Sequence, residues 1–146
     1  MKSQKYSKIP TQEDLQNFSG MHCARLYRGA VESRWKCPSS GRTAQQLVRW
    51  TEIKGPSFRA RFGDEHGMGF SVSLTRHHCH GHGRFLETLI CGDCNSADGA
   101  AKRKLKLPKD WSFSAEEIRQ FVSVKPYSGA TYIDYETAMS IYRLNS

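Results

Sequence analysis

The chain has 146 residues, 38% of them hydrophobic, and carries three Trp, seven Phe and six Tyr. This length and aromatic content predict one packed globular domain over residues 1–146 and exclude a disordered tail. Lys and Arg outnumber Asp and Glu by 22 to 14, so the formal net charge is +8. Such an excess favours a polyanionic partner, nucleic acid first, although a merely basic soluble surface explains it equally well.

Membrane and secreted classes are also disfavoured. No window approaches the ~18 apolar residues that span a bilayer, and the N-terminus lacks the apolar core of a secretory signal. We therefore expect an intracellular protein. The cysteine count is five, an odd number, and Cys91 and Cys94 have metal-binding C-x-x-C spacing. Metal-binding thiolates in a reducing compartment are thus favoured over disulfides.

The N-terminal part is predicted to be mainly helical. A helix is expected over 11–18, where Thr11 can cap the first turn, and a second helical segment over 21–35. The stretch 35–43, WKCPSSGRT, is typical of a tight turn around a metal or a hairpin. Residues 43–53 fit a short helix or a strand.

The middle of the chain alternates as strands do. FRARF, at 58–62, predicts a strand with a basic face, and 70–75 predicts a strand that leads directly into the histidines. A further strand is expected over 85–90. A basic helix is expected over 96–107, beginning near Asn95 and closed by Pro108.

Two more helices are expected near the C-terminus. Ser114 and Glu117 form a capping box ahead of an apolar run, which predicts a helix over 112–122. A last helix is expected over 133–144, and 125–131 is typical of a linker.

The cysteines predict a structural zinc site. Cys91 and Cys94 supply half of the four ligands that such a site needs. A second knuckle would come from WKCPSSG, but Ser40 stands where a cysteine would complete it, and a hydroxyl is a poor zinc ligand beside thiolates. We expect the ligands Cys23, Cys37, Cys91 and Cys94, with His22 or His66 as substitutes for Cys23. Cys23 can also be an ordinary buried cysteine on a helix face.

The histidines fit a different kind of site. His77 and His78 are adjacent, so on a strand they point to opposite faces and suit separate roles. One imidazole can hold a divalent ion while the other takes a proton from water. The amide oxygen of Asn95 is a hard ligand suited to Mg²⁺ or Mn²⁺. The alternative is a single structural zinc bound by His78, His80, Cys91 and Cys94.

Four short motifs follow one another in this region. They are His77-His78-Cys79-His80, Gly81-His82-Gly83-Arg84, Leu89-Ile90-Cys91 and Cys94-Asn95, with Asp98-Gly99 directly behind them. In this order they resemble the HNH or ββα-metal (His-Me finger) nucleases, and most closely the recombination endonuclease VII family. The resemblance covers residues 35–107 and is strongest over 77–99.

The resemblance implies an α+β fold. Its ββα-metal core, with a structural zinc knuckle, would occupy 35–107, between an N-terminal helical segment at 1–34 and a C-terminal helical segment at 108–146. The implied activity is DNA endonuclease cleavage, with His78 as general base and His80 supporting the base or positioning phosphate. His77 and Asn95 would hold the catalytic Mg²⁺ or Mn²⁺, and Zn²⁺ would be structural.

Basic residues would hold the DNA by its phosphates. The expected set is Arg59, Arg61, Arg84, Lys102, Arg103, Lys104 and Lys106. For most single lysines a solvated surface charge is an equally ordinary interpretation. The resemblance also implies a homodimer, and a phage or mobile-element source with the enzyme in the host cytoplasm. Junction-specific, sequence-specific and nicking activities stay open, and the rival function is a zinc-stabilised nucleic-acid-binding module without catalysis.

Overall fold

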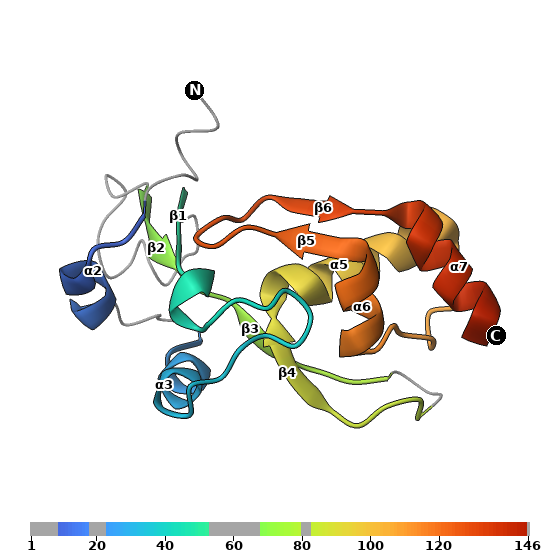
Figure 1. The fold of residues 1–146 in the computed structure, drawn as a ribbon, viewed down its shortest axis with the longest axis horizontal. Coiled ribbons are helices and arrows are strands. Elements are labelled where there is room, and N and C mark those ends of the chain that lie inside the picture. Colours follow the sequence, from blue (N-terminus) through green and yellow to red (C-terminus); the bar gives the residue numbers. More distant parts are fainter. Residues whose placement is uncertain (1–8, 18–22, 53–67, 80–82, 146) are drawn as a thin grey trace.

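The fold is a mixture of helices and small antiparallel sheets. The computed structural model describes residues 9–17, 23–52, 68–79 and 83–145 (Figure 1). These contain five α-helices, one short 3₁₀ helix and three two-stranded sheets. The expected α+β class is confirmed at this level. Among the described residues, no helix has the length and apolar composition needed to cross a bilayer.

The N-terminal part contains both expected helices. They are α2 (Gln12–Asn17) and α3 (Ala24–Glu32), followed by the 3₁₀ helix η2 (Gln45–Leu47) and by β1 (Arg49–Glu52), which pairs antiparallel with β2 (Met68–Ser71). Thr11 caps α2 as predicted, because its Oγ1 accepts a hydrogen bond of 3.1 Å from the Asp14 amide. The stretch 43–53 therefore holds a helical turn and a strand. The expected FRARF strand lies outside the described residues.

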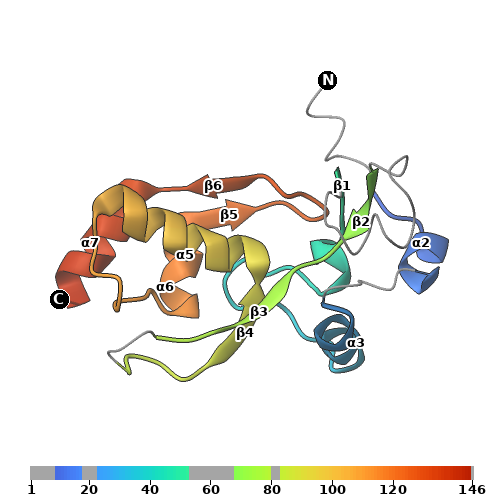
Figure 2. The same cartoon turned by 180° about the vertical axis from the view of Figure 1, so that it is seen from behind.

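A hairpin and the helix that follows it form the centre of the molecule (Figure 2). Strand β3 (Leu74–His77) pairs antiparallel with β4 (Thr88–Cys91), so that Leu74 faces Cys91 and His77 faces Thr88. Helix α5 (Gly92–Leu105) begins directly after β4. Gly92 is required there, because an added Cβ would lie 2.0 Å from the Ser73 Oγ.

Three boundaries differ from those predicted. The single strand expected over 70–75 is two strands, because β2 pairs with β1 and β3 pairs with β4, and the chain changes sheets at residues 72–73. Strand β4 starts at Thr88, later than expected. Helix α5 starts at Gly92 because Cys91 is its N-cap, with a sulfur that accepts from the Cys94 amide.

The C-terminal part contains the expected helices and a hairpin that was not predicted. Helix α6 (Ala115–Phe121) has the predicted capping box, and α7 (Tyr135–Asn145) ends the described chain. Between them, β5 (Val122–Val124) pairs with β6 (Thr131–Ile133). Each strand has only three residues, too few for an alternating pattern to stand out. The linker-like stretch 125–131 is the turn of this hairpin.

The core lies where α5, α6 and α7 meet the hairpins. Phe113, Ile118 and Ile90 are fully buried, and Trp111 and Phe121 pack edge-on against Phe113. The segment 111–114 therefore anchors the C-terminal part of the molecule to α5. This segment also contacts the histidine region.

Candidate metal centre

Three cysteines from distant parts of the chain converge at the start of α5. The sulfurs of Cys37, Cys91 and Cys94 all lie within 4.8 Å of one another, and the three residues are buried. Cys37 comes from the 36–43 turn, Cys91 ends β4 and Cys94 lies in the first turn of α5. Tetrahedral zinc with Zn–S bonds of about 2.3 Å separates its sulfurs by about 3.8 Å. The group can hold a metal ion such as zinc.

The turn around Cys37 has the geometry of a metal knuckle. Lys36 and Thr43 form an isolated bridge, and the Gly41 amide donates to the Cys37 carbonyl at 2.8 Å with a φ of +77°. The amides of Ser40 and Cys91 both donate to the Cys37 sulfur at 3.4 Å. Amide donors that point at a sulfur favour its thiolate form, which is the form that binds metal.

Ser40, rather than Cys23, lies beside the three cysteine sulfurs. The Ser40 Oγ lies 3.8 Å from the Cys91 sulfur. The thiol of Cys23 instead donates to the Leu74 carbonyl at 3.6 Å, and Cys23 is buried outside the group. The structure thus brings together three of the four predicted zinc ligands and does not bring in Cys23. The substitutes His22 and His66 lie outside the described residues.

Arg42 is a member of this centre that the sequence did not predict. Its side chain is 2% exposed, and Nη2 donates to the Cys91 sulfur at 3.2 Å and to the Asp93 carboxylate at 3.0 Å. Nε donates to the Ser40 Oγ at 3.2 Å. Three thiolates around Zn²⁺ carry one net negative charge, which the guanidinium of Arg42 neutralises. No local signal pointed to Arg42, because Asp93 lies 51 residues further along the chain.

The thiol pKa values describe a cluster that shares a single negative charge when no cation is present. Hydrogen bonds from Cys91 and Cys94 hold the pKa of Cys37 far below its usual value. The same hydrogen bonds to Cys37 raise the pKa of Cys91 and the pKa of Cys94. A bound cation is what allows all three sulfurs to be thiolates together, so metal binding releases protons.

His77 and Asn95 meet beside this cluster. His77 ends β3, is 2% exposed and stacks on Phe85 with ring centroids 5.0 Å apart. Its Nδ1 lies 3.2 Å from the Asn95 Oδ1, and its Nε2 lies 2.6 Å from the Phe113 carbonyl oxygen. The predicted ligand pair is therefore in contact across 18 residues of sequence.

The protonation of His77 follows from these partners. A carbonyl oxygen can only accept, so Nε2 carries a proton, and in the neutral ring Nδ1 presents a lone pair toward Asn95. Nδ1 and Oδ1 are then two acceptors facing each other. Two neighbouring ligands of an octahedral ion with bonds of about 2.1 Å are about 3 Å apart, so the pair fits a small divalent cation. An Asn95 amide turned by 180° would instead donate to Nδ1 without any ion.

His78 lies on the other face of the strand. It is exposed, and its Nδ1 lies 3.3 Å from the Arg76 carbonyl oxygen, which can only accept. In the neutral ring the proton is then on Nδ1, and the lone pair that a general base needs is on Nε2. His80, the other predicted catalytic histidine, lies outside the described residues.

Arg84 is used within the protein. Its two terminal nitrogens donate to the Glu117 carboxylate at 3.1 and 2.8 Å, and its guanidinium lies 4.2 Å from the Trp111 ring centroid. It also donates to the Ser112 carbonyl. The guanidinium therefore holds the loop after β3 against α6, and its donors are not presented to solvent.

The remaining predicted DNA-binding residues divide into three groups. Lys102 pairs with Asp98 at 3.5 Å and donates to the Ser112 Oγ at 3.2 Å. Arg103, Lys104 and Lys106 are exposed at the C-terminal end of α5. Arg59 and Arg61 lie outside the described residues. Among the predicted residues that the structure describes, Arg103, Lys104 and Lys106 have exposed side chains, and the Lys104 Nζ also lies 5.9 Å from the Tyr135 ring centroid.

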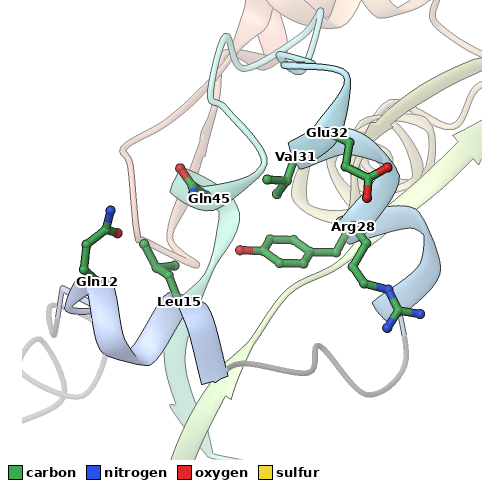
Figure 3. A pocket seen from close by; sticks show the side chains of 7 residues that line it. Gln12, Leu15, Arg28, Val31, Glu32 and Gln45 are labelled. Carbon is green, nitrogen blue, oxygen red and sulfur yellow. The ribbon is translucent and has the colours of Figure 1, made fainter.

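Two surface depressions lie near these elements. One, of ≈ 570 Å³, lies between α3 and β3 and includes His78 in its lining. The other, of ≈ 400 Å³, lies between α2, α3 and η2, where Leu15 and Val31 face it (Figure 3). The second contains none of the predicted ligands or bases, so only the first adjoins the candidate site.

Comparison of the chain with protein-family models, with curated proteins and with solved structures finds no match. The support for a function is therefore the geometry of the chain itself. It consists of a soft cysteine cluster and a nitrogen–oxygen pair, both at the first turn of α5.

Proposed function

We propose that the protein is a metal-dependent DNA endonuclease of the ββα-metal type. The observation that carries the proposal is the contact between the His77 Nδ1 and the Asn95 Oδ1, two hard ligand atoms 3.2 Å apart. The β3–β4 hairpin followed directly by α5 supports it, because this is the strand–strand–helix order that such a core needs. The cysteine cluster adds support by fixing the turn at which α5 starts.

In this proposal each residue has one role. A divalent ion, when bound by His77 and Asn95, supplies positive charge against the charge that develops on the phosphate and the leaving oxygen. The Nε2 of His78 takes a proton from a water molecule, whose oxygen attacks phosphorus as the bond to the 3′ oxygen breaks. The departing oxygen takes a proton from solvent. His80 supports the base or positions the phosphate.

The proposal is tested by measuring plasmid cleavage by the His78→Ala variant, which lacks the proposed base. Plasmid cleavage with Mg²⁺ or Mn²⁺ should fall by roughly 10²–10⁴-fold, while folding and DNA binding persist because His78 is exposed. Cys79→Ala, one residue away, is the matched control and should cleave normally. Equal cleavage by wild type and His78→Ala would refute the role of His78. Supercoiled, linear, single-stranded and four-way-junction substrates in the same assay define the specificity.

A second candidate is a zinc-stabilised nucleic-acid-binding module that cuts nothing. The burial of His77 favours it, because a ring 2% exposed and bonded to the Phe113 carbonyl has the surroundings of a structural histidine. Metal analysis separates the two candidates. One tightly held zinc with a second, exchangeable divalent ion that Asn95→Ala abolishes supports the nuclease, whereas zinc alone supports the module.

A further inference from the structure

A groove between α3 and β3 extends from the predicted base, His78, to residues that were not among the predicted site residues. Arg25 and Leu26 of α3 line one side, and Thr75 and Arg76 of β3 line the other. His78 and Glu87 complete a depression of ≈ 570 Å³. Figures 1 and 2 both show α3 beside the start of the β3–β4 hairpin. The groove therefore leads along β3 to the proposed base.

Two guanidinium groups in this groove differ from those of Arg42, Arg49 and Arg84, which are paired within the protein. Arg42 and Arg49 share the Asp93 carboxylate, and Arg84 is paired with Glu117. Arg25 and Arg76 are exposed, and in the part of the chain that the structure describes neither side chain forms a hydrogen bond or an ion pair. Their donors are available to a ligand, and the planar guanidinium matches phosphate oxygens.

The first turn of α3 adds to the positive potential. Arg25 and Leu26 belong to this turn, which has no acidic residue, and Cys23 before it makes no side-chain capping hydrogen bond. The amides at such a helix start carry partial positive charge. Among the described residues that line the groove, Glu87 is the one acidic side chain, and it opposes anion binding.

We propose that this groove binds the phosphodiester backbone of DNA, with Arg25 and Arg76 each contacting one phosphate on the way to His78. The proposal rests on the proposed function, in which DNA is the substrate, and the second candidate shares with it a nucleic-acid partner. Charge complementarity selects the occupant, because two unpaired guanidinium groups and a helix start face one depression on a protein with net charge +8. It adds Arg25 and Arg76 to the basic residues expected from sequence.

The test measures binding of the full chain to a fluorescent DNA duplex by anisotropy. Ca²⁺ replaces Mg²⁺, so that cleavage is avoided without a chelator that would strip zinc. The variant Arg25→Ala/Arg76→Ala should bind roughly tenfold or more weakly. It should also reduce the slope of log affinity against log salt by about two, as expected for the loss of two phosphate contacts.

Three controls accompany it. Arg119→Ala removes an exposed arginine from α6, which does not line the groove, and should bind as wild type does. Arg25→Lys/Arg76→Lys keeps the charge and should retain most of the affinity. Glu87→Gln removes the opposing charge and should bind DNA more tightly. This variant tests the groove proposal even if the double alanine variant fails to fold.

The outcomes separate this proposal from the proposed function. Suppose that wild type cleaves DNA but that Arg25→Ala/Arg76→Ala and Glu87→Gln both bind DNA with wild-type affinity. This result would overturn the groove proposal and leave the nuclease proposal intact. If the double variant binds DNA more weakly but wild type cleaves no DNA, the groove proposal is supported and the nuclease proposal is refuted. A wild-type protein that binds no DNA would overturn both.

Discussion

The cysteine cluster and the His77–Asn95 pair lie side by side, since Cys94 and Asn95 are consecutive in α5, but they are held in different ways. The three cysteine side chains are buried, and several groups contact their sulfurs. Backbone amides donate to the sulfurs of Cys37 and Cys91, and the guanidinium of Arg42 donates to the sulfur of Cys91. The pair depends on His77, which is held by the Phe113 carbonyl and the Phe85 ring. Both sites join distant segments, but the cluster has several independent contacts between the 36–43 turn and the start of α5, whereas the His77 ring is held by one carbonyl 36 residues away and by one neighbouring ring.

That distant segment, 111–114, is itself held by three charged side chains. Asp98 accepts from the Phe113 amide at 2.9 Å, Lys102 donates to the Ser112 Oγ, and Arg84 donates to the Ser112 carbonyl. A carbonyl that orients a histidine ring fixes which nitrogen faces a ligand. Arg84 and Lys102, which were predicted to contact DNA, therefore contact the segment whose Phe113 carbonyl bonds to His77.

Cys91→Ala, in the cysteine cluster, should have the largest effect of the substitutions that compare the two sites. Removing one thiolate should abolish tight zinc binding and lower the free energy of unfolding by more than about 4 kcal/mol, because the metal and the buried turn are lost together. Metal content and chemical denaturation measure this. Cys79→Ala, outside the cluster, should change neither. Full zinc content in Cys91→Ala would contradict the assignment of the cluster.

Substitution of His77 in the His77–Asn95 pair should destabilise the protein less than Cys91→Ala and should leave zinc bound. His77→Ala deletes a buried ring and its hydrogen bond to Phe113, so the free energy of unfolding should fall by about 2–4 kcal/mol. Zinc content should stay at the wild-type value if the two sites are independent. Loss of zinc on this substitution would mean that His77 belongs to the cysteine site.

Arg84→Met tests the support of the histidine site. The substitution leaves the half-buried Glu117 carboxylate without its bidentate partner, and should destabilise the protein by about 1–3 kcal/mol. In the double variant Arg84→Met/Glu117→Gln much of the loss should be recovered. Additive losses in this cycle, measured by denaturation, would mean that the two side chains do not interact.

Ser40→Cys tests whether residue 40 can supply a fourth zinc ligand to the cysteine cluster. A thiolate at the fourth corner, in place of the Ser40 hydroxyl, should bind zinc about tenfold more tightly or better, as a competing chelator would measure. Cys23→Ala should leave the zinc affinity unchanged. The opposite pattern, with affinity dependent on Cys23, would show that Cys23 is the fourth ligand after all.

The smallest expected effect is the pH dependence of the Arg84–Glu117 pair. Burial raises the pKa of Glu117, but the hydrogen bonds from Arg84 outweigh it and hold that pKa below its usual value. A carboxyl with a lowered folded-state pKa stabilises the protein above its unfolded pKa of about 4.3, and this stabilisation is lost as the pH falls through the folded pKa. Denaturation from pH 7 to pH 3 should show a steeper loss for wild type than for Glu117→Gln.

Features that depend on neighbours in sequence were predicted well. The cap at Thr11, the capping box at Ser114 and the turn around Cys37 all follow from residues within a few positions, whereas α5 starts at Gly92 rather than near Asn95 as predicted. The pairing of His77 with Asn95 was also anticipated, from the sorting of hard and soft ligands and from the resemblance. The β5–β6 hairpin was missed because short strands leave no periodic pattern.

What the sequence by itself determined is the chemistry available at each turn: thiolates in the two knuckles, imidazoles at the end of a strand, an amide oxygen at the start of a helix. Tertiary structure decided which of them meet. It brought Cys37, but not Cys23, to the C-x-x-C pair, and it directed Arg84 to Glu117, whereas Arg25 and Arg76 have no ion-pair partner among the described residues. These choices depend on contacts between residues dozens of positions apart, where burial and charge pairing select one partner among several of the same type.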